Sequence, residues 1–135
     1  MPVAVYEELA EAKTQENVRL AVLSSPAWLE VRIAGEAPWS TFPVTLHRGE
    51  REAILLAETL HSDVLLIDEQ VGRAIALSRD LPLSGTLGVL ERADTMGLVW
   101  NLPEVLNDFK TSGFFIAESL EQKLIQRHRA RGESK

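Results

Sequence analysis

The segment that most constrains the fold is the apolar run Val64-Leu65-Leu66-Ile67, which is followed at once by Asp68 and Glu69. A short, uninterrupted run of this kind is typical of a buried strand in a parallel sheet. Helical patterns flank it, because apolar side chains recur at helical spacing over residues 49–60 and again over 71–78. The run therefore predicts an α/β domain with a mostly parallel sheet.

The rest of the chain continues this alternation of strands and helices. Helical spacing predicts one or two helices over residues 3–23, and a period-2 alternation predicts a half-buried strand from Trp28 to Ala34. Pro103 and Gly113 are typical of the first turn and the end of a helix. The remaining expected elements are short strands over residues 81–85 and 114–116 and helices over residues 86–95, 103–112 and 120–131.

Composition excludes several classes of protein. The length of 135 residues predicts one domain, and the absence of cysteine rules out disulfide scaffolds, thiolate zinc sites, cysteine nucleophiles and iron–sulfur clusters. The three histidines are isolated, which argues against a zinc site. Because no apolar run approaches the ~18 residues that span a bilayer, we expect no membrane contact and a cytoplasmic location.

Charge divides the chain into an acidic body and a basic end. Of the formal net charge of −6, the last 13 residues carry +4, which leaves −10 for residues 1–122. The basic residues of this end are Lys123, Arg127, Arg129, Arg131 and Lys135. They suit a solvated terminal helix, whose dipole favours cations there, or a surface for an anionic partner such as RNA. We therefore predict a domain over residues 1–122 and a basic helix end over 123–135.

Four acids are expected at one edge of the predicted sheet. On a helical wheel, Glu50 and Glu52 flank the apolar arc of the helix over 49–60. That helix runs antiparallel to the next strand, so its start lies level with Asp68 and Glu69 at the strand end. Ligands of open α/β folds bind at this carboxyl edge, and carboxylates suit Mg²⁺ or Mn²⁺. The alternative is that Glu50 and Glu52 merely suit a helix N-terminus.

Several motifs lie in an order and spacing shared by one known family. They are Gly49-Glu50-Arg51-Glu52-Ala53-Ile54, Leu65-Leu66-Ile67-Asp68-Glu69, Gly72-Arg73, Ser84-Gly85-Thr86-Leu87-Gly88-Val89-Leu90, Gly97-Leu98 and Gly113-Phe114-Phe115-Ile116, with Pro2-Val3-Ala4-Val5-Tyr6-Glu7-Glu8-Leu9 before them. Over residues 2 to about 120, the chain resembles a prokaryotic family of predicted nucleic-acid-binding proteins with a PIN domain, related to VapC-type toxins. The resemblance implies a PIN-like three-layer sandwich with a mostly parallel central sheet.

The resemblance also implies a site. Glu8 matches the second acid of a PIN site, and Glu52 matches the third, with Glu50 a close competitor. Asp68 or Glu69 matches the fourth. The implied catalytic residues are Glu8, Glu52 and Asp68, and the implied ligands of Mg²⁺ or Mn²⁺ also include Glu50 and Glu69.

The implied function is a divalent-metal-dependent ribonuclease, a candidate endoribonuclease and toxin of a toxin–antitoxin pair, with RNA as substrate and an antitoxin protein as partner. The alternative is a noncatalytic PIN-like module that binds RNA or a protein. In this family a strand ending in the first acid precedes the segment like Pro2–Leu9, whereas this sequence begins at Met1. We therefore expect an N-terminally truncated domain, or a start placed too late, with open sheet edges that favour a homo-oligomer.

Overall fold

The structure, a computed structural model, describes residues 1–36 and 41–133. It divides into two units, Met1–Gly85 and Thr86–Lys135, which are considered in turn. Among the described residues, none of the helices is both long and apolar enough to cross a lipid bilayer.

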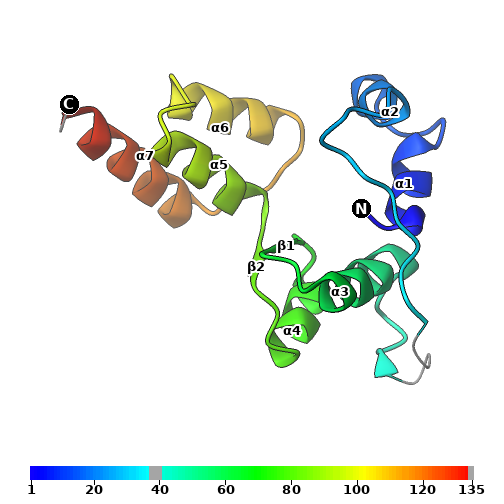
Figure 1. Cartoon of the computed structure of the whole chain (residues 1–135). Coiled ribbons are helices and arrows are strands. Elements are labelled where there is room, and N and C mark those ends of the chain that lie inside the picture. Colours follow the sequence, from blue (N-terminus) through cyan, green and yellow to red (C-terminus); the bar gives the residue numbers. More distant parts are fainter. Residues whose placement is uncertain (37–40, 134–135) are drawn as a thin grey trace. The chain divides into compact units, whose positions relative to one another are not determined.

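The first unit combines helices with a small sheet. Its elements are α1 (Val3–Ala10), α2 (Glu16–Leu23), α3 (Arg48–Leu60), β1 (Leu65–Leu66), α4 (Gln70–Ser78) and β2 (Leu83–Ser84) (Figure 1). α1 packs against α2 and α3, and α3 also packs against α4 and β1. The predicted α/β class is confirmed, with a sheet smaller than expected.

α3 ends in a tight turn that sends the chain back along the helix. His61 adopts the left-handed conformation at φ 48°, and Ser62 N–H donates to the Ala57 carbonyl at 3.1 Å. The side chains of Ile54 and Ala57 are buried in the core of the unit. Because the turn is short, β1 runs back toward the first turn of α3, as the sequence predicts.

The two strands form the predicted parallel pair. Leu65 N–H donates to the Pro82 carbonyl at 2.7 Å, and Ile67 N–H donates to the Ser84 carbonyl at 2.9 Å. The side chains of Leu65 and Ile67 are buried, whereas Leu66 between them is 61% exposed. The run therefore buries only one of its faces, unlike the fully buried strand that its composition predicts.

Two other predicted strands are wrong. In the segment from Trp28 to Ala34, the only strand-like pairing among the described residues is a single parallel bridge between Pro2 and Arg32. Residues 114–116 form no strand, because Phe114 N–H closes the preceding helix onto the Phe109 carbonyl at 3.0 Å. Alternation and β-propensity do not form a strand where no neighbouring strand supplies the hydrogen bonds.

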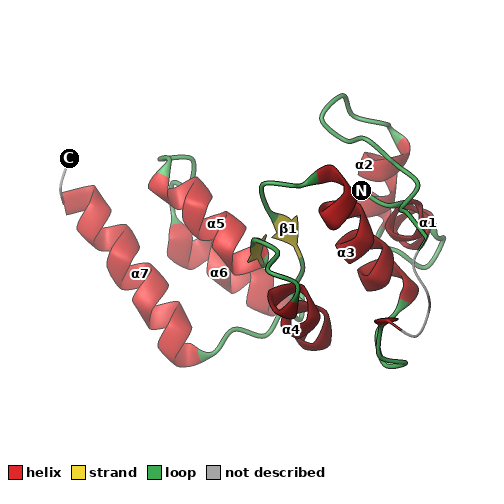
Figure 2. Cartoon of the chain, turned by 60° about the horizontal axis from the view of Figure 1, so that its bottom comes forward, coloured by secondary structure: helices red, strands yellow, loops and turns green. Residues whose placement is uncertain are grey.

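The second unit is helical and has its own core. Its helices are α5 (Thr86–Thr95), α6 (Leu102–Thr111) and α7 (Glu118–Glu133), and both α5 and α6 pack against α7 (Figure 2). Leu102, Leu106 and Leu124 are almost completely buried. Asn101 caps α6 by accepting a hydrogen bond from Glu104 N–H at 3.3 Å. The predicted domain boundary between residues 122 and 123 lies within α7 and stays a prediction.

Gly72 in α4 packs too closely on the core to carry a side chain. A Cβ at this position would lie 2.5 Å from Cδ1 of the buried Ile67. We expect Gly72→Ala to lower the free energy of unfolding by about 1–3 kcal/mol through overpacking. Gly132→Ala is the control, because its Cβ would meet nothing within 4 Å, and we expect it to stabilise α7 by up to about 1 kcal/mol. Chemical denaturation measures both, and a Gly72→Ala variant as stable as the unsubstituted chain would contradict this packing.

Candidate active site at the first turns of α3 and α4

The carboxylate of Glu8 lies against the first turn of α3. A Cβ built on Gly49 would lie 2.7 Å from Glu8 Oε1 and 3.2 Å from Oε2. Gly49 is buried, and its lack of a side chain makes room for this carboxylate. The positive end of the α3 dipole favours the negative charge there. α1 and α3 thus bring together Glu8 and the turn that carries Glu50.

Glu50 is the least satisfied acid of this region. Its Oε2 atom is buried and has no hydrogen-bond partner among the described residues. Its Cγ lies 3.5 Å from the position that a Cβ on Gly72 would take, so the side chain extends toward the first turn of α4. Buried carboxylate oxygens without a partner are rare in folded proteins and call for a ligand or another explanation.

Glu69 caps α4. Its Oε2 atom accepts a hydrogen bond from Gly72 N–H at 2.8 Å. The backbone N–H groups of Gly72 and Val71 hold the pKa of the Glu69 carboxyl below its ordinary value. Glu69 is therefore ionised at neutral pH, and its contact places it beside the same glycine that Glu50 approaches.

Asp68 lies at the carboxyl end of β1, beside the residue that follows β2. A Cβ on Gly85 would lie 2.5 Å from Asp68 Oδ1 and 3.1 Å from Arg73 Nη1. Arg73 in turn donates from Nη1 to the Ile67 carbonyl at 2.8 Å. The sheet edge therefore holds a carboxylate and a guanidinium against one glycine. The sequence motifs contain Arg73, but nothing in its spacing predicts this role.

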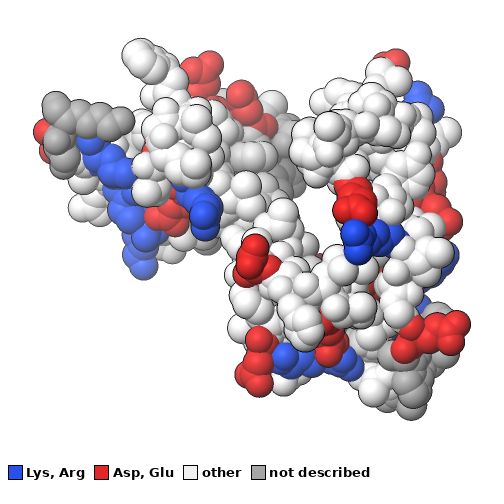
Figure 3. All heavy atoms as spheres, in the orientation of Figure 1, with Lys and Arg blue, Asp and Glu red and all other residues white. Residues whose placement is uncertain are grey.

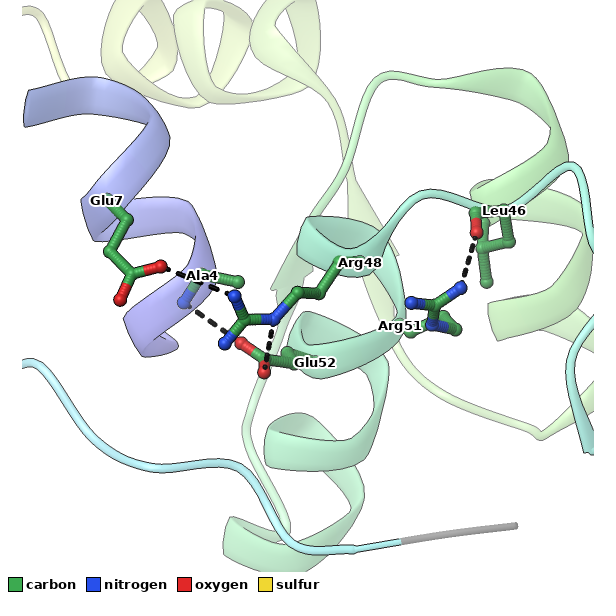
Figure 4. Close-up of polar contacts among 6 residues, drawn as sticks. All are labelled: Ala4, Glu7, Leu46, Arg48, Arg51 and Glu52. Atoms are coloured by element: carbon green, nitrogen blue, oxygen red, sulfur yellow. Dashed lines mark hydrogen bonds and ion pairs between the residues drawn. The ribbon is translucent and has the colours of Figure 1, made fainter. Parts of the chain in front are cut away.

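Glu52, the predicted third acid, is occupied by other contacts. Its Oε2 atom accepts a hydrogen bond from Ala4 N–H at 2.9 Å, and its Oε1 atom accepts one from Arg48 Nε at 3.2 Å (Figure 4). Arg48 also contacts Glu7 at 3.4 Å. Pro2 provides no side-chain cap for α1, so Glu52 satisfies an N–H group that the first turn leaves open. Glu52 thus holds α1, which carries Glu8, against α3.

The structure brings together some of the predicted site residues but not all of them. The Glu8 carboxylate lies by Gly49 and the Glu50 side chain lies by Gly72, where Glu69 accepts a hydrogen bond, whereas Asp68 lies at Gly85. Carboxylate oxygens are suitable donors for Mg²⁺ or Mn²⁺, and the buried Oε2 atom of Glu50, which has no hydrogen-bond partner among the described residues, suits such an ion. In residues 1–36 and 41–133, however, no three acidic or histidine side chains are grouped closely enough to hold a metal ion.

The basic end of the chain is partly used within its own unit. Arg127 pairs with Glu91 at 3.0 Å, and Arg131 pairs with the buried Asp94, so both fasten α7 to α5. Figure 3 shows Lys and Arg side chains gathered over α7 with acidic side chains among them. Lys123 and Arg129 are exposed, and Lys135 lies outside the described residues. The interpretation of this end as a purely solvated helix therefore does not account for the ion pairs that Arg127 and Arg131 form with α5.

Comparison with known proteins gives one result. A family model described as a PIN domain, DUF3368, matches residues 1–130. No curated protein and no solved structure gives a significant match.

Proposed function

The chain belongs to the PIN-domain family, and from this membership we propose that it is a divalent-metal-dependent ribonuclease. Its substrate in this proposal is single-stranded RNA, and its ion is Mg²⁺ or Mn²⁺. The observation that carries the proposal is the buried Oε2 atom of Glu50, which has no hydrogen-bond partner among the described residues. A bound cation supplies the partner that such an oxygen needs.

The proposed ligands are Glu8 and Glu50, with Asp68 and Glu69 in support. Glu8 and Glu50 come from two helices that meet at Gly49, and Glu69 is kept ionised by the N–H groups of α4. Bound there, Mg²⁺ or Mn²⁺ would neutralise charge on a phosphodiester and lower the pKa of a bound water. Relative to the expectation from sequence, this assignment exchanges Glu52 for Glu50 as the third acid.

Two further residues keep the carboxylates in position. Glu52 fixes the first turn of α1 through Ala4 N–H, and so sets where Glu8 reaches α3. On the same turn of α3, Arg51 donates from Nη1 to the Leu46 carbonyl at 3.0 Å and fixes the chain that enters the helix (Figure 4). The chemistry proposed for Glu8 and Glu50 therefore depends on contacts made by residues that do not touch the ion.

A noncatalytic module that binds RNA or a protein is the second candidate. It is favoured by the lack of a group of three potential ligands in residues 1–36 and 41–133. In either case we propose that the exposed Lys123 and Arg129 on α7 contact RNA phosphates. The role of a toxin acting in the cytoplasm, held inactive by an antitoxin protein, belongs to the first candidate only.

Cleavage of a labelled single-stranded RNA by the full chain separates the two candidates. We expect cleavage with Mg²⁺ or Mn²⁺ and none after chelation with EDTA, because the ion supplies the activated water. RNA binding without cleavage under either metal would reject the ribonuclease and leave the noncatalytic module.

A further inference from the structure

The segment over residues 29–34 follows a turn, closed by Leu29 N–H donating to the Pro26 carbonyl at 2.9 Å, and one of its backbone edges is already paired. Arg32 N–H donates to the Met1 carbonyl at 2.9 Å, and Val3 N–H donates to the Arg32 carbonyl at 3.1 Å. The Glu30 carbonyl accepts a hydrogen bond from the Met1 amino group at 2.6 Å. The backbone groups of Glu30 and Arg32 therefore face the N-terminal residues, and those of the residues that alternate with them face the opposite side.

The opposite edge is open and apolar. Val31 and Ile33 make no backbone–backbone hydrogen bond within the part of the chain that the structure describes. Val31 and Ile33 are 40% and 86% exposed, and Trp28 is 81% exposed. An unpaired edge that carries exposed apolar side chains is a template for another strand.

The sequence of this edge is complementary to itself. In an antiparallel pairing centred on Val31, Glu30 lies opposite Arg32 of the second copy, and Arg32 lies opposite Glu30 of the second copy. Within one chain, Arg32 Nε already contacts Glu30 Oε1 at 2.8 Å, so the two charges share one face. On the other face, Val31 meets its own copy and Leu29 meets Ile33 of the second copy.

We propose that this edge binds a second copy of the chain as an antiparallel strand. The outward N–H and C=O groups of Val31 pair with those of the same residue in the second copy. Ile33 N–H pairs with the Leu29 carbonyl of the second copy. A strand without this charge order leaves Glu30 and Arg32 unopposed, so a second copy fits this edge better than an arbitrary apolar strand. Pairing along one short edge buries less than a standard interface, so the dimer forms in a concentration-dependent way.

Charge reversal with mixing tests the proposal directly. In a self-paired dimer of Glu30→Arg, each introduced arginine lies opposite Arg32 of the second copy. In a self-paired dimer of Arg32→Glu, each introduced glutamate lies opposite Glu30 of the second copy. We expect each variant alone to dimerise about tenfold more weakly than the unsubstituted chain. An equimolar mixture restores the dimer, because every arginine then faces a glutamate, and the double variant Glu30→Arg/Arg32→Glu restores it alone. Sedimentation velocity follows the change from the 15.0 kDa monomer to twice that mass.

A second variant tests the backbone pairing without changing any charge. Val31→Pro removes an outward N–H group that makes no backbone hydrogen bond within the described part of the chain, so we expect it to remain monomeric with an unchanged circular dichroism spectrum. Three results overturn the proposal: an unsubstituted chain that stays monomeric into the millimolar range, a mixture that fails to associate while the double variant also fails, or a Glu30→Arg variant that dimerises as tightly as the unsubstituted chain.

Discussion

The variant Glu50→Gln is expected to lose metal-dependent RNA cleavage by roughly 100-fold or more while it stays folded. The proposed ion supplies several kcal/mol of transition-state stabilisation, and each 1.36 kcal/mol corresponds to a factor of ten in rate. Glutamine keeps the size of the side chain, and the buried Oε2 atom of Glu50 makes no hydrogen bond among the described residues that the change would break. Cleavage per folded molecule, measured at saturating Mn²⁺, is the quantity to compare.

Glu52→Gln is the matched control for this loss. Its side chain accepts hydrogen bonds from Ala4 N–H and Arg48 Nε, so we expect a loss of stability of about 1 kcal/mol through the weakened contact with Arg48. The rate of cleavage per folded molecule should fall far less than in Glu50→Gln. The opposite order of the two variants would return the role of third acid to Glu52, as the sequence predicts.

The largest loss of stability is expected from Asp94→Ala in the second unit. The Asp94 side chain is buried, and it contacts His128 Nδ1 at 2.6 Å and the guanidinium of Arg131. Its removal leaves both partners on α7 without their acceptor, which costs about 2–3 kcal/mol in the free energy of unfolding. Arg127→Ala, which breaks the more exposed pair with Glu91, should cost less than about 1 kcal/mol. Equal effects in chemical denaturation would contradict this assignment.

The same carboxylate makes the stability of the protein depend on pH. Burial opposes ionisation of Asp94, but the hydrogen bonds and charges of Arg131 and His128 outweigh it and hold the pKa below the ordinary value of 3.8. Because the pKa of Asp94 is lower in the folded state, its ionised carboxylate contributes its full stabilisation above pH 3.8. This stabilisation is lost as the pH falls through the pKa of the folded state. Below pH 3.8, the unsubstituted chain should therefore lose stability more steeply than Asp94→Ala.

Sequence patterns predict the elements whose contacts are local or whose partners are near in the chain. α3 follows from its helical periodicity, and β1 follows from its apolar run beside a helix that folds back on it. The strand predicted from Trp28 to Ala34 is wrong because alternation does not specify a hydrogen-bonding neighbour. Among the described residues, only Met1 and Val3 form backbone hydrogen bonds along its edge. A period-2 alternation indicates which face of a segment is apolar, whereas a sheet also requires a second segment that hydrogen-bonds to the first.

The candidate site shows the same limit. A helical wheel places both Glu50 and Glu52 at the border of the core, and it cannot tell which one meets α1. That choice depends on Ala4 N–H, whose position is set by the packing of α1 on α3. The contacts of Glu8 with Gly49 and of Asp68 with Gly85 also arise between elements that are distant in the sequence.

Calorimetric titration of Mn²⁺ tests the metal site most directly. Three forms of the full chain are compared: the unsubstituted protein, Glu8→Gln/Glu50→Gln, and the control Glu16→Gln/Glu36→Gln, in which both replaced acids are exposed. Each double variant removes the same charge from an acidic body, so the control reports nonspecific binding. We predict saturable binding to the unsubstituted protein and the control, and none to Glu8→Gln/Glu50→Gln. Equal binding by all three forms, or binding by none, would contradict a metal site at the first turns of α3 and α4.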